Sequence, residues 1–493
     1  MNKSLLTFSI IAILLFTSFK SNAQEQTNSK DLYSKIDNYL TAGSKNGFSG
    51  AIAVVKNGNI IINKGYGFAN KDRKTINNPN TIFDIGSNTK QFTAIAILKL
   101  VELGKLKVTD SLHSYFTKLP IDKRNITIHQ LLTHSSGFPE SIGSEYSSFE
   151  KLSGISQKDF FERLFTSSLL SVPGEKYSYS NVGYSILGRI IEVASKQSYE
   201  AFLSKYLFSK AGMTKTGYLL PSWNTEQFAY GYNRNILKTV PTVALYQEVG
   251  SVNWHLKGNG GINSNQNDML LWHKALKTNK ILSEKLSKKL ATPYVPMNSK
   301  STHSYGYGWI VNTSISKALR LSHSGSNGAY WHTLIWYPEK DIFITYATNA
   351  NSEKLENVAY VVAKIILEEN YTPKPIENNI YSFIMQYLQK NPINKSKELI
   401  SLLRENYADE FTNPRSLNTV GNLLIRYNEN INWAIELFKI NVQLYPNDGN
   451  LWDSLGDGYK ANNLKKEAIN SYQKAIELGY KDSQKKLLEL NKN

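Results

Sequence analysis

The chain has 493 residues, of which 41% are hydrophobic and 12% aromatic, enough for two or three domains with their own cores. It contains no cysteine, which excludes disulfide bonds, thiolate catalysis and cysteine-based zinc sites. The formal net charge of +17 raises the question of nucleic acid, but only nine of the 57 basic residues are arginine and the lysines are spread along the chain. Because arginine carries most specific phosphate and base recognition, we expect a solvated lysine-rich surface and no nucleic-acid partner. Attraction to an anionic cell-wall polymer stays open.

The first 23 residues have the layout of a secretory signal peptide. Lys3 supplies a positive start, residues 5–16 form an apolar run, and small residues precede the position after Ala23. The alternative is a membrane anchor, but a run of 12 apolar residues is shorter than the roughly 20 that span a bilayer. We therefore expect cleavage after Ala23, a mature net charge of +15, no stable membrane insertion and a periplasmic or secreted location.

Residues 24–371 carry the pattern of one domain with mixed secondary structure. Residues 30–40 place apolar side chains on one face of a short helix. Residues 49–70 contain two β-rich runs around Asn57 and Gly58, a strong hairpin signal. A helix begins near Ser87, and residues 107–290 have mainly the pattern of helices and loops.

Strand patterns rich in β-branched and aromatic residues return at 305–312, 318–326, 330–338 and 341–349. Tyr305, Tyr307 and Trp309 alternate along the first of these runs, and we expect them to be core residues on one strand. An amphipathic helix over 353–369 closes the domain. The fold class expected is α/β (α+β): an antiparallel sheet made of strands from both ends, flanked by helices, plus a helical lobe from the middle.

A linker is predicted at residues 372–379, followed by an all-helical region over 380–493. Ala434 and Phe438 recur 34 residues later as Ala468 and Tyr472. Further matches to the tetratricopeptide pattern are Trp452, Leu455, Gly456, Tyr459 and Ala475. The region therefore resembles a short, all-α tetratricopeptide array with one good and one degraded repeat. Such an array can present a concave surface to a peptide or protein partner; the alternative is that it only braces the catalytic lobe.

The segment FDIGSNTKQFTA (83–94) holds Ser87 and Lys90, three residues apart. The same spacing recurs at Ser148, Ser314, Ser471 and Ser483, so the tetrapeptide alone is a weak signal. Ser87 differs because it follows Gly86 and opens a mostly apolar helix. Residues i and i+3 share a helix face, so the amine can reach the hydroxyl, and burial would favour its neutral, basic form. The alternative is a serine N-cap with a lysine that extends to solvent.

Two further segments favour a catalytic site. YSYSNVGYSILG (177–188) contains Tyr179 and Asn181, a Tyr-x-Asn triplet on a turn before a helix, and LSHSGSNGAY (321–330) contains His323 and Gly325 at the end of a predicted strand. Each is weak alone, because a Tyr-x-Asn triplet also occurs at 445–447 and a lone strand histidine usually has a structural role. In this order, with 92 and 144 residues between Ser87, Tyr179 and His323, the three motifs form a specific set.

With LLTHSSGF (131–138) and GNGGINSN (258–265), these segments resemble the serine β-lactamase and penicillin-binding-protein superfamily over about residues 30–368, in particular its class C and D-Ala-D-Ala-carboxypeptidase-like branch. The related class A signatures are S-x-x-K, S-D-N and K-T-G; here Tyr179 replaces the serine of the second and His323 the lysine of the third. The resemblance implies an acyl-enzyme on Ser87, with proton transfer shared by Lys90 and Tyr179. It leaves open which of these two is the general base.

The resemblance also implies substrate-binding roles. Asn181 would orient the lysine and bind a substrate amide, and the backbone N–H groups of Ser87 and Ser326, the latter next to Gly325, would form the oxyanion hole. His323 carries less charge than the usual lysine, so strong recognition of a penicillin carboxylate is not expected. We expect His134, in LLTHSSGF, to fix a turn. No cofactor and no metal are implied.

The function expected is therefore an exported serine hydrolase that acts on an amide, ester or β-lactam in a small-molecule or peptide substrate. The alternative is a catalytically dead, penicillin-binding-like scaffold that binds cell-wall peptide or protein partners through its tetratricopeptide tail. Three intact motifs in order argue against a dead site. A metal-dependent hydrolase has no H-E-x-x-H motif to support it.

Overall fold

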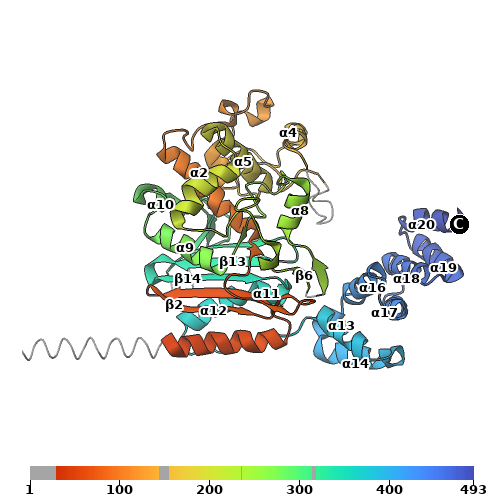
Figure 1. Ribbon diagram of the computed structural model, residues 1–493. Coiled ribbons are helices and arrows are strands. Elements are labelled where there is room, and N and C mark those ends of the chain that lie inside the picture. The colour runs from red at the N-terminus through yellow and green to blue at the C-terminus, as the bar shows by residue number, and fades with distance from the viewer. Residues whose placement is uncertain (1–28, 144–154, 235, 314–317, 493) are drawn as a thin grey trace, which may run out of the picture. The chain divides into compact units, whose positions relative to one another are not determined.

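The computed structural model describes residues 29–143, 155–234, 236–313 and 318–492 (Figure 1). The predicted leader, residues 1–23, lies outside the described residues. The chain divides into two compact units, Met1–Asn233 with Lys238–Ile376, and Arg234–Leu237 with Glu377–Asn493. The boundary after Ile376 falls within the predicted linker. In the part of the chain that is described, no helix has the length and apolar character needed to cross a bilayer.

The first unit is built on an eight-stranded sheet in the order β2-β1-β14-β13-β12-β11-β10-β9. β1 (Gly50–Lys56) and β2 (Asn59–Tyr66) form the predicted hairpin, whose turn residues Asn57 and Gly58 have φ angles of 51° and 76°. β1 also pairs antiparallel with β14 (Ile342–Thr348), from the far end of the unit. Strands from both ends of the unit thus meet in one antiparallel sheet, which confirms the predicted fold class.

The later strands form the half of the antiparallel sheet that reaches the candidate site. β12 (Leu319–Ser326), β13 (Trp331–Tyr337) and β14 follow one another as predicted. The prediction of one strand over 305–312 is wrong, because the run is divided between β10 (His303–Tyr305) and β11 (Ile310–Thr313), with β9 (Val295–Pro296) beyond them.

Gly308 explains why this run breaks. Its φ angle is 78°, and a Cβ there would lie 2.9 Å from the carbonyl oxygen of Lys90, so the connecting turn lies against the start of α2. Such a left-handed turn interrupts the strand. Tyr305, Tyr307 and Trp309 are buried core residues as predicted, although they do not share a strand.

Helices cover both faces of the sheet (Figure 1). A helix over 29–45 and α12 (Val358–Leu367), preceded by α11 (Glu353–Glu356), pack on one face and share a core with β1 and β14. α9 (Gln266–Lys277) lies on the other face. Beyond it is a helical lobe centred on α2 (Thr89–Glu102) and α5 (Asn181–Ser195), which contact each other.

The lobe explains the apolar sequence after Ser87: most side chains of α2 are buried, so the helix is apolar on nearly every face. Side-chain caps begin several of the surrounding helices; Ser180 Oγ, for example, accepts the Gly183 N–H at the start of α5 at 3.0 Å. The other helices of the first unit are α3 (Ile128–Leu132), α4 (Gln157–Thr166), α6 (Tyr199–Leu203), α7 (Ser209–Ala211), α8 (Thr242–Val249) and α10 (Glu284–Leu290). Its short strand pairs are β3 (Phe68–Asn70) with β4 (Thr75–Ile76), β5 (Phe83–Asp84) with β8 (Asn263–Ser264), and β6 (Gly231–Asn233) with β7 (Leu237–Thr239).

The second unit is helical, as predicted. Its helices are α13 (Ile380–Lys390), α14 (Ser396–Asn406), α15 (Ala408–Phe411), α16 (Arg415–Arg426), α17 (Ile431–Leu444), α18 (Gly449–Ala461), α19 (Lys465–Glu477) and α20 (Ser483–Lys492). Two successive hairpins repeat one contact: a Cβ at Gly421 would lie 2.6 Å from the Phe438 ring, and one at Gly456 would lie 2.5 Å from the Tyr472 ring. This recurrence fits a helical repeat, and assignment to the tetratricopeptide class stays a prediction.

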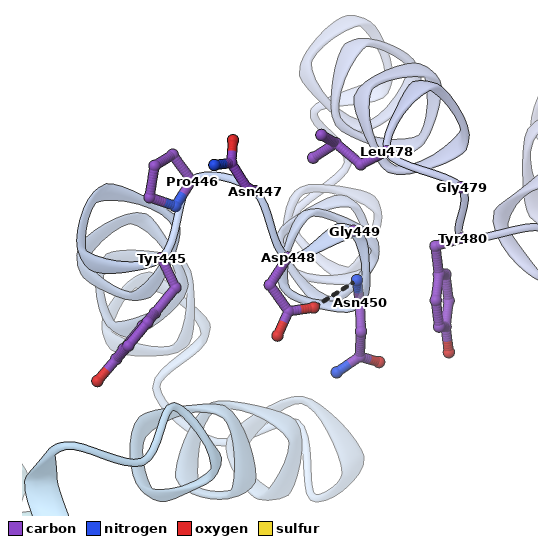
Figure 2. Close-up of a pocket in the computed structure, with 9 residues that line it drawn as sticks. All are labelled: Tyr445, Pro446, Asn447, Asp448, Gly449, Asn450, Leu478, Gly479 and Tyr480. Carbon is purple, nitrogen blue, oxygen red and sulfur yellow. Dashed lines mark hydrogen bonds between the residues drawn. The ribbon is translucent and has the colours of Figure 1, made fainter.

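A shallow pocket of about 660 Å³ lies between two turns of this unit, the one after α17 and the one after α19 (Figure 2). The Asp448 carboxylate accepts the Asn450 N–H at 3.0 Å and so begins α18. Tyr445 and Tyr480 stand on either side of this cap in the figure. The pocket therefore belongs to the inter-repeat turns and contains none of the predicted catalytic residues.

The contact between Gly456 and Tyr472 predicts the effect of Gly456→Ala. Alanine normally stabilises a helix interior relative to glycine by about 0.5–1 kcal/mol. Here the added methyl group would overlap the tyrosine ring, so we expect a loss of about 1–3 kcal/mol in the free energy of unfolding of the helical unit. Denaturant unfolding followed by circular dichroism measures this loss. Gln473→Ala, at an exposed position of α19, is the control and should leave stability unchanged.

Candidate active site

Ser87 lies on a short 3₁₀ turn, Gly86–Asn88, that joins β5 directly to α2. Gly86 has a φ angle of 50°, and a Cβ there would lie 2.5 Å from the backbone nitrogen of Ser326. Reciprocally, a Cβ at Gly325 would lie 2.4 Å from the backbone nitrogen of Ser87. The end of β12 therefore packs against the serine turn by backbone contact, which brings the N–H groups of Ser87 and Ser326 into one neighbourhood. Ser87 is half-buried and Ser326 exposed, so solvent reaches this point.

Lys90 is fully buried one helical turn further on. Its Nζ lies 3.0 Å from Ser87 Oγ, 2.7 Å from Asn181 Oδ1 and 2.8 Å from the Asn259 carbonyl oxygen. Burial holds the pKa of Lys90 well below its usual value, although the nearby Glu140 carboxylate opposes this shift.

These three contacts fit both protonation states of the amine, and burial favours the neutral one. The oxygens of Asn181 and Asn259 can only accept hydrogen bonds, so they take the two N–H groups of a neutral lysine. Ser87 Oγ accepts the third N–H when the amine is protonated; when the amine is neutral, its lone pair is available to the Ser87 hydroxyl. The arrangement is suited to removing a proton from Ser87.

Tyr179 lies beside this pair. Its ring centroid is 4.8 Å from Lys90 Nζ and 4.3 Å from the ring centroid of His134. His134 Nδ1 accepts the Ser180 N–H at 3.0 Å, so the proton of the neutral ring is on Nε2. Burial, together with the charge of Lys90 when that amine is protonated, holds the pKa of His134 well below its usual value. His134 thus supports the Tyr-x-Asn turn as an uncharged ring, in agreement with the turn-fixing role expected for it.

His323 is buried on β12 with both ring nitrogens engaged. Its Nδ1–H donates to the Ser324 carbonyl oxygen at 2.7 Å, and its Nε2 accepts the Tyr305 hydroxyl at 2.9 Å. Burial and the charge of Lys90 lower the pKa of His323 to about 3, so the ring is neutral at pH 7. It supplies no positive charge to a substrate carboxylate.

The structure brings the predicted site residues together in different ways. Ser87, Lys90 and Asn181 are joined by hydrogen bonds, and Tyr179 by ring contact with the lysine. Backbone contact places Gly325 and Ser326 beside Ser87, while His323 belongs to the same strand and is within the electrostatic influence of Lys90.

Sequence analysis did not assign a role to Asn259, whose carbonyl oxygen contacts Lys90, or to Asp84, which lies three residues before Ser87. The only sequence signal for either is a polar residue in a segment that is otherwise apolar or rich in glycine. Within the described ranges, no group of three His, Asp or Glu side chains is placed to hold a metal ion.

Comparison with known proteins is consistent with this geometry. The family model described as Beta-lactamase matches residues 36–367. A penicillin-binding protein of Bacillus subtilis is 30% identical over 325 residues, which cover 64% of this chain and 71% of that protein. The octameric penicillin-binding protein homologue from Pyrococcus abyssi superimposes with a TM-score of 0.59 at 25% identity, covering 72% of this chain and 81% of its own. A class C beta lactamase superimposes with a TM-score of 0.58 at 20% identity, over 69% of this chain and 99% of its own.

The fold is that of the class C β-lactamases and penicillin-binding proteins, a group of serine hydrolases. The chain belongs to the beta-lactamase family. This confirms the resemblance that the motifs indicated for the first unit, whereas Glu377–Asn493 of the second unit lie outside the family match. The roles of individual site residues stay predictions.

The close approach at Gly86 predicts a large effect of Gly86→Ala. The methyl group would overlap the backbone of Gly325 and Ser326 and push β12 away from Ser87. We expect acylation of Ser87 to slow about 100-fold or more, comparable to the loss of one oxyanion donor. Gly104→Ala is the matched control, since Gly104 also has a positive φ angle, 68°, but open space around its Cβ position. Stopped-flow or gel-based labelling measures the acylation rates of both variants and so separates the steric overlap from backbone strain. Equal acylation rates in the two variants would contradict the steric effect.

The burial of Lys90 predicts that the free energy of unfolding of the protein depends on pH. Its folded pKa lies below the unfolded value, so between the two values the unfolded chain holds more protons and stability rises with pH. Lys90→Met removes this dependence and should raise the melting temperature at pH 7 while abolishing acylation. Thermal melts from pH 6 to 9 test this, and a lower melting temperature for Lys90→Met would contradict it.

In the native protein, the acylation rate should rise with pH through the lowered Lys90 pKa.

Proposed function

We propose that the protein is an exported serine hydrolase that forms an acyl-enzyme on Ser87. The observation that carries this proposal is the position of the Lys90 amine, fully buried and within hydrogen-bond distance of Ser87 Oγ. A serine hydroxyl needs an adjacent base to become a nucleophile, and a lysine kept neutral by burial is such a base.

In the proposed reaction, Ser87 Oγ attacks the carbonyl carbon of the substrate, and its proton passes to the Lys90 amine or to a Tyr179 phenoxide. The developing oxyanion accepts hydrogen bonds from the N–H groups of Ser87 and Ser326. When the tetrahedral intermediate collapses, the leaving amine or alkoxide takes up a proton from the same pair. A water molecule then attacks the acyl-enzyme, and the acid is released as Ser87 regains its proton.

The charges around the site favour substrates whose reacting end carries no carboxylate. His323 is neutral where the K-T-G signature of class A relatives has a lysine. The exposed Glu140 acts on Lys90 from the same region, and its negative charge would repel an anionic substrate. We therefore propose amides or esters without an adjacent carboxylate as preferred substrates, ahead of penicillins.

The proposal also covers the second unit and the leader, for which we propose partner binding and export. The repeated glycine–aromatic contact supports a tetratricopeptide-type array, which would offer a surface to a peptide or protein partner. The leader pattern of residues 1–23 and the absence of cysteine support export to the periplasm or the medium.

Labelling with two acylating probes tests the function. We expect a fluorophosphonate to label the native protein, with slower or no labelling by a fluorescent penicillin, and no labelling of Ser87→Ala by either. Ser471→Ala is the matched control, because Ser471 begins another Ser-x-x-Lys tetrapeptide, and it should label normally. Faster labelling by the penicillin would contradict the substrate preference. Native protein that neither probe labels would support the inactive scaffold instead, and unchanged labelling of Ser87→Ala would place the nucleophile elsewhere.

A further inference from the structure

Asp84 is a buried carboxylate beside the serine turn. It lies on β5, three residues before Ser87, and is 3% exposed. Its Oδ1 accepts the Gly86 N–H at 2.7 Å. Its Oδ2 accepts the Asn327 side-chain N–H at 2.7 Å and the Thr242 hydroxyl at 2.7 Å. All of these donors are neutral, so hydrogen bonds rather than an ion pair hold the carboxylate.

Two of these donors flank the residues whose N–H groups would bind the oxyanion. Gly86 precedes Ser87, and Asn327 follows Ser326. Asn327 in turn orders the connection from β12 to β13, because its Oδ1 accepts the N–H groups of Ala329 at 3.3 Å and Tyr330 at 3.0 Å. The Asp84 carboxylate thus ties the serine turn, through the Gly86 backbone N–H, to the end of β12, through the Asn327 side chain.

Burying the Asp84 carboxylate lowers the stability of the folded chain. Burial raises the pKa of Asp84, so the ionised form is disfavoured in the folded chain, and its hydrogen bonds only partly offset that. A neutral side chain of similar size would connect β5 to its surroundings with a smaller loss of folding stability. A costly group that persists beside a reactive serine points to a functional requirement.

We propose that Asp84 is a positioning residue that fixes the spacing between the Ser87 and Ser326 N–H groups and so sets the stabilisation of the oxyanion. The inference rests on the proposed acyl-enzyme function and adds a residue to it. Asp84 does not touch the substrate; it acts through Gly86 and Asn327. Donors held at a set distance need no reorganisation when charge develops, which is the source of their effect on rate.

Asp84→Asn is the first test. The amide oxygen can still accept the Gly86 N–H, but its NH₂ group then faces the NH₂ group of Asn327 and the tie is lost. We expect the acylation rate constant to fall about 10- to 100-fold, a fraction of the loss of a whole oxyanion donor, with probe affinity changed less than about 3-fold. The melting temperature should stay the same or rise, because a buried charge is removed.

The double variant Asp84→Asn/Asn327→Asp supplies a rescue. The Asn side chain at position 84 would donate to the carboxylate at position 327, which restores the pair with donor and acceptor exchanged. The second oxygen of that carboxylate still accepts the N–H groups of Ala329 and Tyr330. We expect the acylation rate to return to within about 5-fold of the native value.

Asp268→Asn is the matched control. Asp268 is also 3% exposed, its pKa is also raised by burial, and it accepts the Thr216 hydroxyl at 2.8 Å and the Lys215 N–H at 2.7 Å. Its contacts do not include the serine turn or the end of β12, so its acylation rate should stay within about 2-fold of native.

Three results would overturn the positioning role of Asp84 while leaving the proposed function intact. The first is labelling of Asp84→Asn at the native rate, and the second is no recovery of the acylation rate in the double variant. The third is a melting temperature of Asp84→Asn that falls together with its acylation rate, which would mark a structural role. An Asp84→Asn protein that does not fold would also show a structural role. Native protein that neither probe labels would overturn the proposed function itself, which distinguishes the two failures.

Discussion

The site depends on one contact between backbones. The serine turn and the end of β12 approach so closely that a Cβ on Gly86 or Gly325 would overlap the other segment. Any side chain on either glycine would force the two segments, and with them the Ser87 and Ser326 N–H groups, apart. The helical lobe provides the serine and the sheet provides the facing strand, so both must be in place before the pair of N–H donors exists.

Burial also acts on several ionisable groups around this contact. Burial disfavours the charged forms of Lys90, His134 and His323, and the charge of Lys90, when present, disfavours protonation of both histidines. The backbone N–H groups of Ser87 and Ser326 therefore lie beside groups whose charged forms are disfavoured by burial.

Much of the fold was predictable because it follows from local patterns. The hairpin at Asn57 follows from its turn residues, the strands of the 318–349 region from their β-branched and aromatic residues, and the helix after Ser87 from its continuous apolar run. The break in the 305–312 run was missed because Gly308 adopts its positive φ angle against the backbone of Lys90, a neighbour distant in sequence. A periodicity of aromatic residues contains no information about that neighbour.

The sequence by itself determined the family, the order of the three motifs and the identity of the serine, lysine, tyrosine and histidine they contain, because these are properties of residue type and spacing. Only the tertiary structure decided that Lys90 is fully buried within hydrogen-bond distance of Ser87 Oγ and Asn181 Oδ1, and that burial favours a neutral His323. It alone revealed Asp84, whose partner Asn327 lies 243 residues away. Burial and hydrogen-bond partners arise from segments that meet only after folding, and they set the pKa values and distances on which the chemistry depends.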